Sequence, residues 1–132
     1  MTVEDNKEIV LATLAALAAG KYQEMLDHLA DDIQFYVIGT TSYSGMYSGK
    51  DDLLNRLLLP MGAQRDEQGF TEEIINIISE KDHVVTESKG RKTTREGRPY
   101  NNEYLFIYRL ENGKIKEWRC YLDTQLLSST HH

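Results

Sequence analysis

The sequence contains a single cysteine, Cys120, and only two prolines among its 132 residues. One cysteine cannot form an intramolecular disulfide, so the chain shows no sign of the disulfide framework of a small secreted protein. The N-terminal stretch MTVEDNKEIV has neither the basic nor the apolar region of a signal peptide. No apolar run approaches the roughly 20 residues that a membrane-spanning helix needs. These absences predict a cytoplasmic protein.

An excess of basic residues is also absent, because 15 lysines and arginines stand against 21 acidic residues and give a formal net charge of −6. Binding to nucleic acid requires clustered lysine and arginine that neutralise phosphates, and an anionic membrane surface attracts the same residues. We therefore expect neither nucleic acid nor membrane as a partner. The hydrophobic content of 40% is that of an ordinary globular protein. The length predicts one domain over residues 1–132.

Motifs for common cofactors are missing. The sequence has no phosphate-binding loop, dinucleotide-binding fingerprint or nucleophile elbow. His28 and His83 do not form a metal-ligand spacing, and we leave His131 and His132 at the chain end out of the candidate site. The sequence therefore predicts no cofactor and no metal.

The pattern of apolar residues changes halfway along the chain. In the first half, a capping pair at Asp5 and Glu8 and a stop at Gly20 bound a first helix. Further helices are expected at 22–29 and at 51–59, where Pro60 ends the last one, with a strand at 33–38 between them. Period-two segments then predict strands at 70–78, 84–93, 100–110 and 115–124. This order predicts an α+β fold in which three N-terminal helices pack on a curved, mainly antiparallel sheet.

The last predicted hairpin has two possible registers. A two-residue turn at Asn112 and Gly113 would pair Trp118 with Ile107, whereas a three-residue loop would pair Trp118 with Phe106. The second register separates the residue types better. It gives one face with aromatic and neutral polar side chains, formed by Asn102, Tyr104, Phe106, Trp118, Cys120 and Leu122. Such a face suits a small-molecule pocket.

A four-residue loop at 95–98 would add Glu87, Lys89 and Arg91 to the same pocket face. The opposite face of the last hairpin is charged but contains Leu105, Ile107 and Tyr121. That face would meet solvent or the rim of a dimer.

Several stretches resemble the nuclear transport factor 2-like superfamily, and in particular its SnoaL-like polyketide cyclases. They are LADDI at 29–33, GTTSYSGMYSGK at 39–50 and YNNEYLFIYRLENGKIKEWRCYLDT at 100–124. The resemblance covers nearly the whole chain and implies a cone-shaped fold with an interior pocket. It also implies a homodimer that forms through the outer sheet face. The fold hosts isomerases, dehydratases, cyclases, epoxide hydrolases and binding modules, so the resemblance does not fix a reaction.

The catalytic residues of two related enzyme types are not matched. The positions that carry the catalytic groups of ketosteroid isomerases fall on Thr13, Val37 and Phe106, which cannot perform that chemistry. The last hairpin is similar to that of limonene epoxide hydrolase, but the key aspartate position holds Cys120. The resemblance therefore implies neither a standard isomerase nor an epoxide hydrolase.

Glu87 is the predicted general base, because aromatic walls at Phe106 and Trp118 would desolvate its carboxylate and raise its pKa. A solvated ion pair with no catalytic role is the alternative. Tyr104 and Asn102 are expected to donate hydrogen bonds to a substrate carbonyl or enolate. The predicted ligand-binding residues are Trp118, Phe106, Cys120, Lys89, Tyr36 and Leu122. We interpret Cys120 as a buried structural thiol, because no basic partner is placed beside it.

Two functions follow from these residues. The first is a cofactor-independent acid–base enzyme that isomerises, cyclises or dehydrates a small apolar carbonyl compound. The second is a non-catalytic small-molecule-binding protein or a dimeric assembly module of the same fold. The absence of the catalytic carboxylates found in related enzymes favours the second function. The polar and aromatic residues on the predicted pocket face favour the first.

Overall fold

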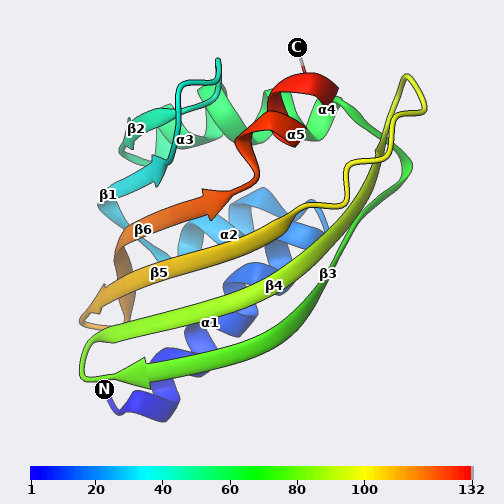
Figure 1. The fold of residues 1–132 in the computed structure, drawn as a ribbon. Helices are drawn as coiled ribbons and strands as arrows, with labels where there is room; N and C mark the ends of the chain where they lie inside the picture. Colours follow the sequence, from blue (N-terminus) through cyan, green and yellow to red (C-terminus); the bar gives the residue numbers. More distant parts are fainter. Residues whose placement is uncertain (132) are drawn as a thin grey trace.

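The computed structural model describes residues 1–131. The helices and strands of this part of the chain are α1 (Val3–Ala18), α2 (Tyr22–Asp27), β1 (Leu29–Val37), β2 (Gly45–Ser48), α3 (Lys50–Leu53), the π-helical turn η1 (Leu54–Leu58), α4 (Leu59–Ala63), β3 (Arg65–Glu80), β4 (His83–Thr94), β5 (Glu103–Glu111), β6 (Lys114–Leu122) and α5 (Thr124–Thr130). Figure 1 shows a curved sheet with α1 and α2 behind it and the helices α3, α4 and α5 gathered at one end. The predicted α+β fold is confirmed.

The strands form one sheet in the order β2-β1-β6-β5-β4-β3. Only the β1–β6 pair is parallel, and every other neighbouring pair within the described residues is antiparallel. The two long strands β3 and β4 curve around α1, as Figure 1 shows. Fully buried side chains from both layers, such as Val10 of α1 and Val84, Tyr108 and Trp118 of the sheet, meet on the concave face. The core and any interior pocket therefore lie between the sheet and the helices.

Helix α1 begins earlier than predicted. Its N-cap is Thr2, whose hydroxyl accepts from the Asp5 amide at 3.0 Å, while the Asp5 carboxylate accepts from the Thr2 amide at 2.9 Å. The capping box therefore joins Thr2 to Asp5, and the predicted pair of Asp5 and Glu8 is wrong. The predicted stop is confirmed, because Gly20 follows the helix with a left-handed φ of 74°.

The third predicted helix runs past Pro60. Helical structure continues from Lys50 through the π-helical turn η1 to Ala63. Proline lacks the N–H that a regular helix needs and its ring crowds the preceding turn, and the wider turn of η1 directly before Pro60 makes room for it. The prediction that Pro60 ends the helix is therefore wrong.

The last hairpin combines a short turn with a bulge. Asn112 and Gly113 both have positive φ, at 52° and 76°, and form a two-residue turn. The register then shifts between the pairs Leu110–Ile115 and Arg109–Glu117, so that Trp118 lies opposite Tyr108. Both predicted partners of Trp118 are thus wrong. The predicted faces are nevertheless confirmed, because the bulge adds one residue and restores the alternation that a three-residue loop would have given.

The register of β4 differs from the prediction by one residue. A bridge between Thr93 and Pro99 leaves five residues in the loop, one more than expected. Thr86 therefore lies opposite Phe106, and Ser88 lies opposite Tyr104. A slip of one residue turns every side chain of a strand to the other face. The inward residues of β4 are consequently the even-numbered ones, and Glu87 and Lys89 point outward.

Candidate functional site

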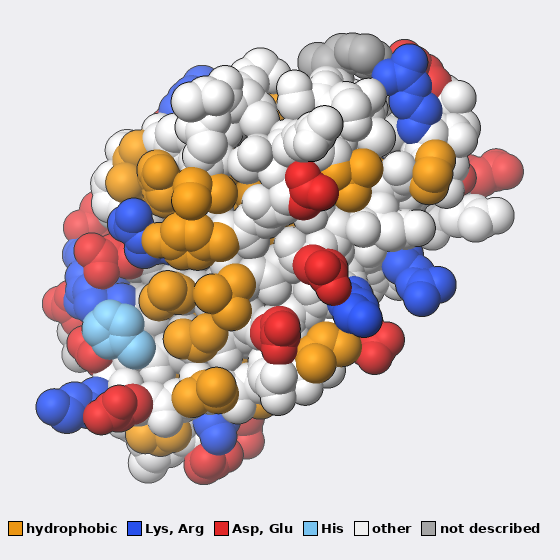
Figure 2. Space-filling model, in the orientation of Figure 1, with side chains coloured by type: hydrophobic (Ala, Val, Ile, Leu, Met, Phe, Trp, Pro, Cys, Tyr) orange, Lys and Arg blue, Asp and Glu red, His pale blue; other side chains and the backbone are white. Residues whose placement is uncertain are grey.

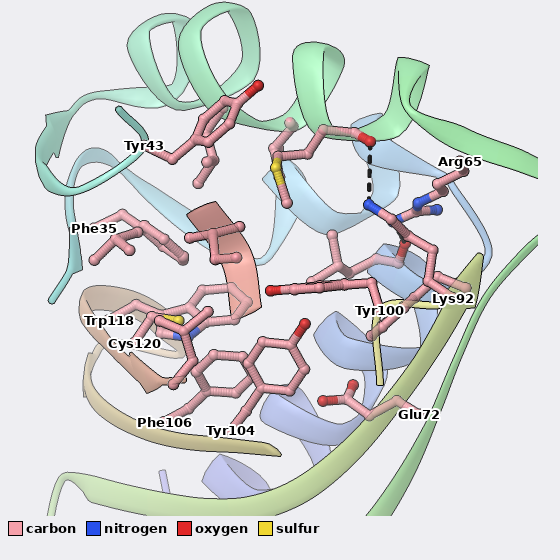
Figure 3. A pocket seen from close by; sticks show the side chains of 18 of the residues that line it. Phe35, Tyr43, Arg65, Glu72, Lys92, Tyr100, Tyr104, Phe106, Trp118 and Cys120 are labelled. Atoms are coloured by element: carbon pink, nitrogen blue, oxygen red, sulfur yellow. Dashed lines mark hydrogen bonds between the residues drawn. The ribbon is translucent and has the colours of Figure 1, made fainter. Parts of the chain in front are cut away.

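An interior cavity of about 120 Å³ lies between the concave face of the sheet and the helices. This volume holds several water molecules or a small organic ligand. Figure 3 shows that the lining residues fall into two groups. The aromatic end is formed by Phe35, Tyr43, Phe106, Trp118 and Cys120, and the polar end by Arg65, Glu72, Lys92, Tyr100 and Tyr104. A ligand that fits both ends has an apolar body and one polar group.

The aromatic end is a packed cluster of rings from β1, β5 and β6. Trp118 is fully buried, and its ring centroid lies 4.9 Å from that of Phe35 and 5.5 Å from that of Phe106, in edge-to-face contact. The indole N–H of Trp118 has no hydrogen-bond partner among residues 1–131. The cluster gives the cavity a rigid apolar wall with one buried donor.

Glu72 of β3 is the carboxylate of the cavity. The Ser88 hydroxyl donates to its Oε2 at 2.7 Å, whereas its buried Oε1 has no hydrogen-bond partner within the described part of the chain. Burial raises the pKa of Glu72, and the hydrogen bond from Ser88 offsets part of that rise. A carboxylate with a raised pKa is a stronger base than an ordinary glutamate, and its unused oxygen can accept a proton from a ligand.

The polar end also holds two tyrosine hydroxyls, those of Tyr104 and Tyr100. Burial raises the pKa of Tyr104 well above its usual range, and the neighbouring Tyr100 raises it further. Burial also raises the pKa of Tyr100 to about 12. The Asn102 side-chain amide donates to the Tyr100 oxygen at 3.0 Å, which leaves the Tyr100 hydroxyl proton available to donate. Both phenols therefore stay protonated at neutral pH and can act as hydrogen-bond donors.

Gly90 makes room for the polar end. It lies opposite Glu72 in the β3–β4 pair. A Cβ atom at this position would come within 2.6 Å of the Phe70 ring and 2.7 Å of the Tyr104 ring. The two rings pack edge to face at 6.4 Å across the bare glycine. Glycine is therefore required here by the close approach of two aromatic side chains.

Lys92 follows Gly90 on the same face of β4 and is the buried amine of the cavity. Its side chain is 6% exposed, and Figure 3 shows it reaching the Met61 carbonyl, at 3.5 Å. Burial lowers the pKa of Lys92 to about 8, and the nearby Arg65 guanidinium contributes to the decrease. The cavity thus holds one acid and one amine that both shift toward their neutral forms.

The cavity includes five of the predicted residues. Tyr104, Phe106, Trp118, Cys120 and Leu122 line it, as the face assignment of the last hairpin predicted. Burial raises the pKa of the Cys120 thiol, which agrees with a structural role. The catalytic role given to Tyr104 stays a prediction.

Two predicted residues of β4 lie on the outer surface. Glu87 is exposed and accepts a hydrogen bond from the Asn76 side chain at 2.6 Å. Lys89 is exposed as well. The prediction that Glu87 and Lys89 face the pocket is wrong, because the loop before β5 is one residue longer than expected.

Two other predicted residues are displaced for different reasons. Tyr36 faces outward, where the Arg119 guanidinium lies 4.6 Å from its ring centre, and Phe35 takes its place in the cavity wall. Asn102 is buried, but it accepts from the Asp123 amide and donates to the Asp123 carbonyl, each at 3.0 Å. These hydrogen bonds connect the segment before β5 to the N-cap of α5, and Asn102 does not line the cavity. The predicted contacts of Tyr36 and Asn102 with a ligand are therefore wrong.

The functional residues that the sequence did not indicate are Glu72, Lys92 and Tyr100. Glu72 stands between Phe70 and Ile74 in period two, and this alternation places it on the face of two apolar residues. That signal is present in the sequence, but the adjacent Glu73 lies on the other face, so the strand shows a charged residue on both faces. The closing helix α5, capped by the Asp123 carboxylate on the Leu126 amide at 3.1 Å, was also missed. Its Leu127 covers the cavity.

One known family model matches most of the chain. The sequence model described as the SnoaL-like domain matches residues 10–118. No curated protein matches the chain. Within residues 1–131, no helix is both long and apolar enough to cross a membrane.

Solved structures resemble the fold over almost its whole length. An NTF2-like protein of unknown function from Burkholderia pseudomallei is 18% identical, with a TM-score of 0.84 and coverage of 99% of this chain and 98% of that one. An LEH-like epoxide hydrolase from M. tuberculosis is 20% identical, with a TM-score of 0.78 and coverage of 98% and 90%. A putative SnoaL-like polyketide cyclase from Jannaschia sp. CCS1 is 12% identical, with a TM-score of 0.80 and coverage of 97% and 92%. At these identities the likeness shows the fold alone.

Proposed function

The chain belongs to the SnoaL-like domain family, and from this premise we propose that it is a cofactor-independent acid–base enzyme acting on a small, largely apolar carbonyl compound. Glu72 is its proton carrier, in place of the exposed Glu87. The observation that carries this assignment is the buried Oε1 of Glu72, which faces an apolar cavity without a hydrogen-bond partner among the described residues. A cytoplasmic location and the lack of a metal stay predictions.

The cavity supports removal of a proton next to a carbonyl group. The Glu72 carboxylate takes the proton from the α-carbon, and the electrons of the broken C–H bond move to the carbonyl oxygen. The enolate oxygen that results accepts hydrogen bonds from the protonated phenols of Tyr104 and Tyr100, which burial holds in their donor form. Protonated Glu72 then returns the proton. In isomerisation the proton returns to a different carbon. In dehydration it goes to a neighbouring hydroxyl group, which leaves as water. In cyclisation the enolate carbon attacks a second carbonyl of the substrate, and the proton goes to the oxygen of that carbonyl.

Exchange of α-protons for deuterium tests this role. The wild-type protein in D2O is mixed with ketones of steroid, terpenoid and polyketide-like phenolic type, and exchange is followed by NMR. We expect Glu72→Gln to reduce the exchange rate by roughly 100-fold or more, the usual contribution of a general base. The matched control Glu87→Gln, altered at an exposed position, leaves the rate unchanged. Exchange that survives in Glu72→Gln contradicts the assignment.

The same samples distinguish an enzyme from a binding protein. Trp118 is the only tryptophan and lines the cavity, so its fluorescence reports occupancy. Fluorescence changes that saturate with ligand while no ketone exchanges its protons point to a non-catalytic binding protein.

The outer face of the sheet favours a second function, assembly of two copies. Figure 2 shows hydrophobic side chains gathered over this face, with charged side chains of both signs at its edge. Strand pairing places neighbouring apolar residues there, namely Ile78, Val85, Leu105, Ile107 and Tyr121. Ile78 is 64% exposed and Leu105 42%. A patch whose rim carries both signs can complement itself in a twofold dimer.

Light scattering after size-exclusion chromatography tests this assembly. We expect a dimer for the wild type and a monomer for Leu105→Glu, because a charge at the centre of the patch opposes burial of the face. Glu103→Gln is the control on the same strand and keeps the dimer. A wild-type monomer at high concentration refutes assembly through this face.

A further inference from the structure

Lys92 occupies an unusual position for a lysine. It is 6% exposed in a mostly apolar cavity, and among residues 1–131 no carboxylate lies within ion-pairing distance of it. Its neighbours are the Arg65 guanidinium, the Tyr100 ring at 5.3 Å and the His131 imidazole. A buried ammonium without an anionic partner is costly, and lysines in such sites favour the neutral amine.

His131 is oriented to accept a proton from this lysine. The Thr130 hydroxyl donates to the Leu126 carbonyl at 2.7 Å, so its oxygen accepts from His131 Nδ1, at 2.9 Å. With the hydrogen on Nδ1, the lone pair of the neutral imidazole is on Nε2. That atom lies 2.6 Å from Lys92 Nζ. The chain-end histidine, left out of the site on sequence grounds, thus belongs to its polar end.

We propose that Lys92 is an amine nucleophile, which forms an imine with an aldehyde or ketone that enters the cavity. The cavity supplies what this chemistry needs: an amine whose neutral form is favoured by burial and by a neighbouring cation, a base in contact with it, and an apolar wall that holds the carbonyl compound. It is the cavity of the proposed enzyme, but formation of the imine does not require Glu72.

The bond changes balance without a cofactor. His131 Nε2 takes one proton from the Lys92 ammonium, and the amine nitrogen attacks the carbonyl carbon to form a carbinolamine. The nitrogen then loses a second proton, and the carbonyl oxygen leaves as water with two protons, one of which His131 returns. The product is an iminium ion between Lys92 and the former carbonyl carbon. Where the proposed function also holds, the iminium makes the α-proton easier for Glu72 to remove.

Reductive trapping tests the reaction. The wild-type protein is incubated with cinnamaldehyde and cyanoborohydride at pH 7, and peptide mapping locates the secondary amine. With a pKa of about 8, Lys92 carries roughly 300-fold more free amine at pH 7 than an ordinary lysine with a pKa of 10.5. We therefore expect Lys92 to be labelled at least 10-fold faster than any other lysine. Labels that fall only on other lysines overturn the assignment.

Three variants complete the test. Lys92→Met should lose the fast label while Lys89→Met, changed at an exposed position of the same strand, keeps it. Glu72→Gln should keep the label even though it loses proton exchange, so the failure of one role is distinguishable from the failure of the other. His131→Ala should slow labelling at pH 7 more than at pH 9, because at pH 9 most of the Lys92 amine is free even without a base. A fast label that persists in Lys92→Met refutes the reaction at this residue.

Discussion

Replacing Lys92 by methionine should stabilise the protein at acidic and neutral pH. The unfolded chain holds the lysine at its ordinary pKa of 10.5, and burial lowers the folded value to about 8. Below pH 8 the folded state therefore carries a desolvated charge, and the shift corresponds to about 3 kcal/mol of unfolding free energy. Methionine has a similar length and no charge, so it removes that cost.

The sign of the pH dependence follows from proton counts. Between pH 8 and 10.5 the unfolded state binds more protons at this residue than the folded state, so the stability of the wild type rises with pH. The cost of the charge is about 3 kcal/mol at pH 6 and about 1 kcal/mol at pH 10. Loss of the hydrogen bond to His131 offsets about 1 kcal/mol at every pH. Lys92→Met should therefore be about 2 kcal/mol more stable than the wild type at pH 6 and about equal at pH 10.

Urea unfolding followed by the fluorescence of the buried Trp118 measures both proteins at pH 6, 8 and 10. Tyrosines and Cys120 also titrate in the unfolded chain over this range, and their contribution cancels in the difference between the two proteins. Lys89→Met serves as the control, and its difference from the wild type should not vary with pH. A difference for Lys92→Met that stays constant from pH 6 to 10, or a variant that is less stable at pH 6, refutes the reasoning.

Three further predictions concern the same cavity. Burial raises the pKa of Glu72 above its unfolded value, so the folded state loses stability as pH rises through the raised pKa. Glu72→Gln should remove this loss, which thermal unfolding at pH 4.5 and pH 8 measures in both proteins. Gly90→Ala should cost about 1–3 kcal/mol in urea unfolding, because its Cβ would overlap the rings of Phe70 and Tyr104, and an unchanged midpoint contradicts that overlap. Asp123→Ala removes the cap of α5 and should cost about 1 kcal/mol, with faster hydrogen exchange confined to that helix.

The sequence could predict the faces of β5 and β6 because a local signal fixes them. Aromatic rings recur at every second position of β5, at Tyr104, Phe106 and Tyr108, and charged residues flank Trp118 on both sides in β6. Only one assignment therefore buries the rings and exposes those charges. The turn and the bulge changed the pairing of Trp118 without changing that assignment. The burial of an alternating strand can thus be predicted even where its exact partners cannot.

The faces of β3 and β4 could not be settled in the same way. Both strands carry polar residues on each face, so the alternation of β4 is between Thr86, Ser88 and Gly90 on one side and Glu87 and Lys89 on the other. The choice between a buried Glu87 and a buried Ser88 then depended only on the length of the next loop. Gly97 and Pro99 mark that loop as a turn but do not fix its length. Glu72 and Lys92 lie on these two strands, which is why the fold and the aromatic wall of the cavity could be predicted while its acid and its amine could not.

The arrangement of β3 and β4 explains why the acid and the amine do not neutralise each other. Glu72 pairs with Gly90 and Phe70 with Lys92, so Glu72 and Lys92 are diagonal neighbours on adjacent strands. Such neighbours lie roughly 7–8 Å apart at Cα, within reach of an ion pair. Yet Ser88 binds the carboxylate on one side and His131 binds the amine on the other.

An ion pair between these two side chains would lower the pKa of Glu72 and raise that of Lys92. Burial moves both pKa values in the opposite direction, toward the neutral forms. Figure 3 shows the carboxylate and the amine on separate sides of the polar end, with the hydroxyls of Tyr100 and Tyr104 between them. In the proposed reactions, the space that separates them holds the carbonyl group of the substrate, with the proton acceptor on one side and the amine on the other.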